Sequence, residues 1–267
     1  MFIAGEFSES EILCNIPPHT LRIDLQARRW KSDVDSESAI VDRNDNGIPI
    51  EFILLGFSPF YGNLGMRQGE EFLRIAYIGV TPKHRLLPPR CVTTSIISGK
   101  SSQKNFIAYF QNLYNNRINC ASVVTSTKFE TRSFNERDPM TGADGAKINY
   151  NALAFSDRPA QNEDEEQLIK DVNEWLKNNG AEQASSALKS VIPGGDLIEL
   201  PLGEDHKALK EAFQASRQSV STEMLASAGD PKALAAASEP PSAKKAVELD
   251  PVNFTSKANK IISQINN

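Results

Sequence analysis

Basic and aromatic side chains share a long stretch of this chain that contains no acid. Between Phe72 and Phe129 the sequence has neither aspartate nor glutamate. The basic residues of this stretch are Arg74, Lys83, Arg85, Arg90, Lys100, Lys104, Arg117 and Lys128, and its aromatic residues are Phe72, Tyr77, Phe106, Tyr109, Phe110, Tyr114 and Phe129. Cations follow the phosphates of a single-stranded nucleic acid, and flat rings stack on its unpaired bases. This composition favours a nucleic-acid surface; the alternative is a half-buried sheet whose outer face is basic.

Further rings lie just outside this stretch. Phe57, Phe60 and Tyr61 occupy what the sequence indicates is a turn, and Trp30 is flanked by basic residues. Stacking on bases is one use for such rings, and the alternative is that they belong to a core or cover the end of a barrel. We predict a nucleic-acid-binding surface made of Trp30, Phe60, Tyr61, Arg74, Tyr77, Lys83, Arg85, Arg90, Lys100, Lys128 and Arg132.

The sequence shows no recognisable catalytic centre. His19, His84 and His206 lie far apart, and none of them has a partner at metal-ligand spacing. A phosphate-binding Gly-x-x-x-x-Gly-Lys-Ser/Thr loop is absent, and the strands with few acids offer no carboxylate pair for hydrolysis. The three cysteines are an odd number, which argues against a disulfide framework. We expect a protein without catalytic residues, cofactor or metal ion, whose cysteines are reduced thiols.

The elements that must position these side chains follow from the hydrophobic periodicity. Alternating and continuous apolar runs predict strands, and apolar residues at helical spacing predict one helix among them. The predicted strands are Ile50–Phe57, Phe72–Val80, Cys91–Ser98, Ser122–Arg132 and Ile148–Phe155, with the helix Gln103–Asn116 between the third and the fourth. This is the element order of an OB-fold, a five-stranded Greek-key barrel. We therefore expect a mainly β protein with an OB-fold-like barrel.

Composition divides the chain into three predicted parts. Residues 1–47 form an N-terminal extension, 48–180 the OB-fold-like domain, and 181–267 a flexible acidic region rich in Ala and Ser with short helices. A helix that begins near Asn162 is expected to pack on the barrel through Trp175. Residues 1–160 carry 18 basic and 17 acidic side chains, whereas 161–267 carry 11 and 17. We expect the region after about Gly180 to be dispensable for nucleic-acid binding and to serve a protein partner or self-association.

Neither a secretory signal nor a membrane span is expected. The first residues, Met1–Glu6, lack a basic segment followed by a long apolar one, and no run of about 18 apolar residues occurs in the chain. The sequence therefore predicts a cytoplasmic protein that does not contact membranes.

The element order, the basic and aromatic strands and the less regular C-terminal region resemble the OB-fold single-stranded-DNA-binding proteins, especially the divergent ones of phages and mobile elements. The resemblance covers roughly residues 48–158. It implies a protein that coats single strands during replication or recombination, in the host cytoplasm if phage-encoded. Members of that family commonly end in a strongly acidic tip, whereas Lys257–Asn267 contains no acid. Recruitment of partners in the manner of the family is therefore not expected.

Two other classes of protein fit the same sequence. The barrel could be the docking module of a structural or adaptor subunit in a larger phage-like or mobile-element assembly, with the basic stretch facing an acidic partner. Alternatively, the ligand is RNA, because contacts to the 2′-hydroxyl decide between the two nucleic acids and leave no mark in this sequence.

Overall fold

The computed structural model describes residues 11–32, 39–40, 50–80, 87–137, 144–201 and 206–216, and for 39–40 and the ends of the hairpin at 136–137 and 144 it describes the backbone alone. All of these residues belong to one unit, Met1–Ser216, and a second unit comprises Arg217–Asn267. The first unit thus extends to Ser216, past residue 180, where composition predicted a boundary. Lys83 and Arg85 lie outside the described residues.

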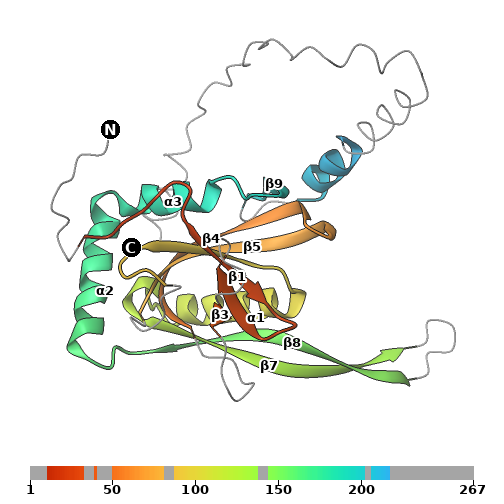
Figure 1. The fold of residues 1–267 in the computed structure, drawn as a ribbon, viewed down its shortest axis with the longest axis horizontal. Coiled ribbons are helices and arrows are strands. Elements are labelled where there is room, and N and C mark those ends of the chain that lie inside the picture. Colours follow the sequence, from red (N-terminus) through yellow and green to blue (C-terminus); the bar gives the residue numbers. More distant parts are fainter. Residues whose placement is uncertain are drawn as a thin grey trace, which may run out of the picture. The chain divides into compact units, whose positions relative to one another are not determined.

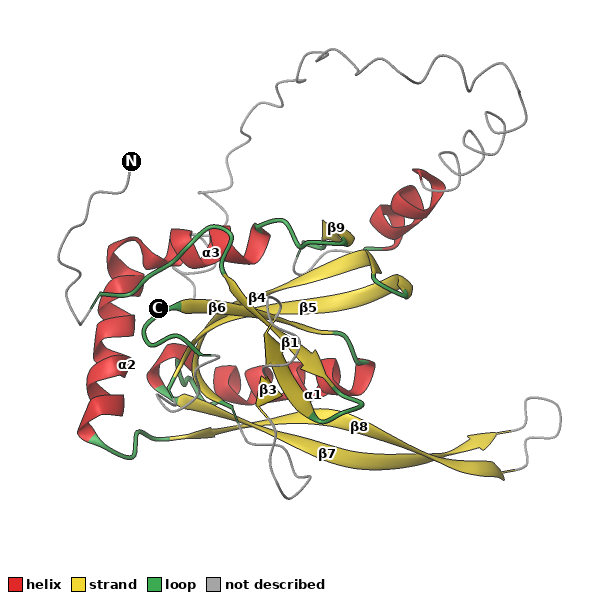
Figure 2. Ribbon diagram, viewed as in Figure 1, coloured by secondary structure: helices red, strands yellow, loops and turns green. Residues whose placement is uncertain are grey.

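A curled sheet dominates the described part of the chain (Figures 1 and 2). Its strands are β1 (His19–Asp24), β2 (Arg29–Ser32), β3 (Ala39–Ile40), β4 (Glu51–Leu64), β5 (Arg67–Gly79), β6 (Val92–Ile97), β7 (Val124–Arg137), β8 (Asp144–Arg158) and β9 (Gly195–Glu199). They run in the order β3-β2-β1-β6-β5-β4-β7-β8, and β9 pairs with the far end of β4. All pairs are antiparallel except β1 with β6. The expectation of a mainly β protein is confirmed.

Four α-helices accompany this sheet in the described residues. They are α1 (Lys100–Asn115), α2 (Glu163–Trp175), α3 (Ala181–Lys189) and a helix over 207–216, and shorter helical segments are η1 (Cys120–Ser122) and η2 (Leu176–Gly180). The predicted order of three strands, a helix and two strands is confirmed by β4, β5, β6, α1, β7 and β8. None of the helices in the described residues is long and apolar enough to cross a bilayer.

The helix α1 lies beside the edge of β8. The hydroxyl of Ser102 accepts the backbone N–H of Leu153 at 2.9 Å, and the amide of Asn105 donates to the carbonyl of the same residue at 2.8 Å. Ser102 and Asn105 thus satisfy the backbone N–H and carbonyl of Leu153, which a neighbouring strand would otherwise pair. Toward the opposite edge of the sheet from β8, β6 pairs with β1, so the predicted N-terminal extension contributes strands to the sheet.

Both faces of the central strands are buried. On one face Phe52, Tyr77 and Trp30 pack with Phe106 of α1. On the other face Ile53 and Ile78 pack with residues of α2 and α3, including Val172. Because side chains alternate between the faces of a strand, the inner part of β5, Phe72–Gly79, is apolar except for Arg74, as expected for a strand covered on both sides. The helices α2 and α3 thus cover the face opposite to α1.

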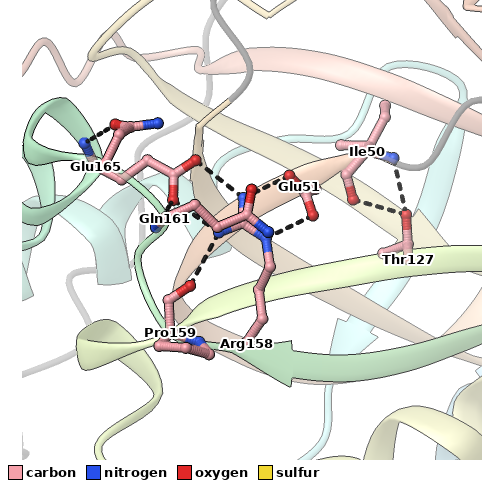
Figure 3. Close-up of polar contacts among 8 residues, drawn as sticks. Ile50, Glu51, Thr127, Arg158, Pro159, Gln161 and Glu165 are labelled. Atoms are coloured by element: carbon pink, nitrogen blue, oxygen red, sulfur yellow. Dashed lines mark hydrogen bonds and ion pairs between the residues drawn. The ribbon is translucent and has the colours of Figure 1, made fainter.

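An ion-pair cluster ties the start of α2 to the sheet (Figure 3). The guanidinium of Arg158, at the end of β8, contacts Glu51 of β4 at 2.6 Å and Glu165 of α2 at 2.7 Å. The Asn162 side chain caps α2 by accepting the backbone N–H of Glu165 at 2.9 Å. Further along, the ring of Trp175 lies 2.3 Å from where a Cβ of Gly180 would be, so only glycine fits there. Trp175 packs half-buried against the core, as predicted.

Candidate nucleic-acid interface

Two of the predicted stacking rings are core residues. Trp30 and Tyr77 are fully buried, and their rings meet edge to face at 6.5 Å. The Tyr77 hydroxyl forms a hydrogen bond with Ser95 at 2.8 Å, and burial raises the Tyr77 pKa. These rings pack on Phe52 and α1 and cannot present a face to a base. For these two residues the core alternative is the correct one.

Phe60 and Tyr61 are also buried, which corrects the prediction of a turn. They lie inside β4, which continues to Leu64, and Tyr61 is 5% exposed. The strand β9 pairs with this part of β4, and the helix over 207–216 covers Tyr61 through the ring of Phe213 at 5.8 Å. Both covering elements come from the region that composition predicted to be flexible. Neither ring is available for stacking.

Arg74 holds a helix rather than a phosphate. Its side chain is 3% exposed and donates to the backbone carbonyls of Leu188 at 2.9 Å and Ser190 at 2.6 Å, and to the hydroxyl of Thr94 at 3.2 Å. The last carbonyls of a helix lack partners within it, so a cation at the end of α3 satisfies them and favours the negative end of the dipole. Burial lowers the pKa of Arg74 to about 10. Its position in the sheet was predicted correctly, but α3 covers it.

Arg90 connects the segment before β6 to α2. Its backbone has a positive φ of 53°, and its guanidinium lies 2.7 Å from a carboxylate oxygen of Asp171. The partly buried pair fixes the segment that follows the undescribed residues 81–86. Arg90 is therefore, like Arg74, a residue that stabilises the fold.

The remaining predicted residues are exposed and lie near one hairpin. Lys100 is the first residue of α1, while Lys128 and Arg132 lie on β7. Past Thr127, which still bonds to Ile50, β7 pairs with β8 alone, and the two strands extend beyond α1 as a two-stranded arm (Figure 1). The two strands pair at Arg132↔Tyr150 and Phe134↔Ile148. Directly paired residues share a face in an antiparallel ladder.

One face of this arm carries rings and cations together. We call Lys128, Arg132, Phe134, Ile148 and Tyr150 the arm face. Phe134 is 51% exposed, Ile148 is 37% exposed, and the rings of Phe134 and Tyr150 lie 5.9 Å apart at an angle of 60°. Adjoining exposed apolar groups of this size are a common feature of binding surfaces.

The arm face is joined to the start of α1. The Ser101 hydroxyl donates to the Tyr150 hydroxyl at 3.3 Å, which brings the neighbouring Lys100 close to the base of the arm. Asn151, on the opposite face of β8, donates to the carbonyl of Gln26 in the β1–β2 turn at 3.4 Å. The base of the arm is therefore held from both sides, while in its outer part each strand pairs only with the other among the described residues.

The Arg132 side chain on the arm takes part in an exposed ion pair that contributes little to stability. Arg132 forms an ion pair with Glu130 at 3.0 Å, and both side chains are exposed. Exposed pairs of this kind contribute about 0–1 kcal/mol to stability, so a phosphate can replace the carboxylate at little cost. Arg132 can therefore bind a phosphate without disturbing the fold.

Groups for covalent or metal chemistry are not assembled in the described residues. They contain no cluster of three or more His, Cys, Asp or Glu side chains that could hold a metal ion. Cys14, Cys91 and Cys120 are free, and burial raises the pKa of each thiol, that of Cys120 to about 11. Protonated thiols are poor nucleophiles.

Sequence reasoning missed Phe134, Ile148 and Tyr150. The predicted strands ended at Arg132 and began at Ile148, so the outer part of the hairpin was left in a loop. The signal that could have found it is the alternation of Lys128, Arg132 and Phe134 at every second or fourth position, which continues one face of a strand. Comparison of the chain with protein-family models, with curated proteins and with solved structures finds no match.

Proposed function

We propose that this protein binds single-stranded nucleic acid without catalysis, and that the arm face and Lys100 form the binding surface. The observation that carries the proposal is the ring pair of exposed Phe134 and half-buried Tyr150 beside Arg132 on a projecting arm. DNA is the favoured ligand, bound as a coat on single strands during replication or recombination.

Single strands suit this surface better than a duplex does. A base stacked on an aromatic ring contributes about 1–3 kcal/mol, but only an unpaired base can leave its neighbours to reach the ring. Lys128 and Arg132 lie on the same face as the rings, so phosphates of the same strand can meet them while the bases stack. Ile148 adds exposed apolar surface on which the bound nucleic-acid strand can lie.

The order of elements supports an OB-fold relationship. In that fold the ligand contacts the second and third strands and the two loops that connect strands one and two and strands four and five. On this relationship, the β7–β8 arm would correspond to the second of these loops. Because α3 covers Arg74 on β5, the proposal relies on the arm and not on the strand face.

The test replaces rings one at a time in the full-length protein. Phe134→Ala and Tyr150→Ala should each weaken binding to a single-stranded oligonucleotide by at least about fivefold, the equivalent of one lost stack. Tyr114→Ala is the matched control, since this ring is 63% exposed on α1 outside the arm. Fluorescence anisotropy gives the affinities, and thermal unfolding shows that each variant is folded. Equal affinities for all three variants, or equal binding of duplex and single strand, would contradict the proposal.

A structural or adaptor role is the second candidate, and the arm also favours it. A two-stranded ribbon is marginally stable in water by itself, and Ile148 with Phe134 could pack on a second protein. Where that second protein is another copy of this chain, the Phe134→Ala variant changes the mass of the protein in solution, while the wild type does not bind oligonucleotides at all. Sedimentation velocity of both proteins separates the two functions.

A further inference from the structure

Three arginines surround one cavity of about 420 Å³ that lies apart from the arm face. The cavity is lined by β1, the β4–β5 turn, β5, β6 and the segment between α3 and β9, and its arginines are Arg22, Arg67 and Arg74. Among the described residues that line it there is no aspartate or glutamate. Three arginines and no acid among the described lining residues give the cavity wall an excess of positive charge, although Glu70, outside the lining, pairs with Arg67.

The deepest of these cations has no carboxylate partner in its hydrogen bonds. Arg74 is 3% exposed, and its hydrogen bonds go to the carbonyls of Leu188 and Ser190 and to the hydroxyls of Thr94 and Ser190. Neutral oxygens satisfy its N–H groups but leave its charge uncompensated. A buried charge without a counter-ion is costly, so an anion that enters the cavity is favoured there.

The outer arginines lie on exposed segments. Arg22 is exposed on β1, and Arg67 follows the β4–β5 turn, where its Nη1 donates to Glu70 at 2.9 Å and to the carbonyl of Ser98 at 3.0 Å. The Arg67–Glu70 pair is exposed, so an anion can replace this carboxylate at little cost. Arg67 can therefore contact an anion held above Arg74, and Arg22 lines the same cavity.

The rest of the wall is apolar. Leu64 and Ile96 come from the sheet, and Ile192 comes from the segment after α3. An inorganic anion would leave these side chains uncovered, whereas a ligand with an organic body would cover them. A volume of this size falls in the range of about 300–1,000 Å³ that is typical of small-ligand sites.

We infer that this cavity binds a phosphate monoester whose organic body rests on Leu64, Ile96 and Ile192. Arginine is the residue best suited to phosphate, because its planar guanidinium donates two parallel hydrogen bonds to it. The group could be that of a free mononucleotide or the phosphorylated end of a strand, which share this chemistry. The inference does not rest on the proposed function, because none of its residues belongs to the arm face.

Calorimetric titration of the full-length protein tests the site with defined probes. Thymidine 5′-monophosphate should bind, and thymidine should bind at least about tenfold more weakly, because it lacks the charged group. Arg22→Gln and Arg67→Gln should each weaken nucleotide binding about tenfold. Arg132→Gln, which removes a cation of the arm face, should leave nucleotide binding unchanged. Arg74 is not substituted, because it holds the end of α3.

Short oligonucleotides with a 5′-phosphate or a 5′-hydroxyl then distinguish the two sources. If the 5′-phosphate tightens binding in the wild type and not in Arg67→Gln, the ligand is the end of a strand; if only the mononucleotide responds to Arg67→Gln, it is a free nucleotide. The inference is overturned if thymidine binds as tightly as its monophosphate, if inorganic phosphate binds as tightly as the nucleotide, or if both arginine variants bind like the wild type. Loss of oligonucleotide binding alone would count against the arm face and leave this site intact.

Discussion

A single arginine joins three segments of this protein, and its surroundings decide its role. Arg158 forms its ion pairs with Glu51 and Glu165 where little solvent reaches them, whereas Arg132 forms its pair with Glu130 in the open. Ion pairs shielded from solvent are costly to break, while exposed ones contribute about 0–1 kcal/mol. The same residue type is thus structural in one place and available to a ligand in the other.

Stability should depend on pH through Glu165. The hydrogen bond from Arg158 lowers the pKa of this carboxyl below its ordinary value. A group whose pKa is lower in the folded state stabilises the protein above its unfolded pKa of about 4.3, and the contribution is lost as the pH falls through the folded value. We expect the urea midpoint to fall below about pH 5, and to fall less steeply in Glu165→Gln.

Urea unfolding from pH 3 to pH 7 measures this difference. Glu163→Gln is the matched control, since this residue is an exposed acid of the same helical turn. Identical acid limbs for Glu165→Gln and the wild type would show that the Arg158 cluster does not control the acid transition.

Elements were predicted well where the pattern is local. The order of β4, β5, β6, α1, β7 and β8 follows from side-chain periodicity, which is set by the nearest residues. Burial was predicted poorly where a distant element provides the cover. Tyr61 lies against residues of the helix over 207–216, and Arg74 lies against α3, and neither contact leaves a mark in the local sequence. Three of the predicted site residues, Lys100, Lys128 and Arg132, are exposed.

The first element after the predicted domain boundary should be essential. Ala184, Ala187 and Leu188 of α3 are buried, and β9 pairs with the far end of β4. A truncation after Asn179 removes both, so we expect it to lose the cooperative unfolding transition. A truncation after Ser216 removes only the second unit and should keep the thermal midpoint within a few degrees of the wild type. Circular dichroism melting measures both. A folded protein that ends at Asn179 would show that α3 and β9 are accessory.

For the molecule as a whole, a formal charge of -5 shapes how it would meet a polyanion. Its attraction to phosphate must be local, because the total charge is repulsive. Contacts by Lys100, Lys128 and Arg132 predict a slope of about −2 for the logarithm of affinity against the logarithm of salt, at about 0.7 per phosphate on a single strand. Arg132→Ala should make the slope shallower by about 0.7.

A salt series with a single-stranded oligonucleotide measures these slopes. Lys170→Ala is the control, since it removes an exposed cation of α2 far along the chain from the arm. A slope that is the same in the wild type and in Arg132→Ala would remove this residue from the phosphate contacts.

The sheet is completed only after strands far apart in the sequence have been synthesised and have paired. Thr20 of β1 meets Thr94 of β6 across 74 residues, and Ser58 of β4 contacts Glu199 of β9 across 141 residues. Contacts of such long sequence separation must be formed against a large loss of chain entropy, which slows folding. During synthesis on the ribosome, β1 cannot pair until β6 has been made. The far end of β4 has an open edge until β9 has been made, nearly two hundred residues along the chain. Open strand edges pair with those of other chains, so the nascent protein is most exposed to aggregation before β9 emerges.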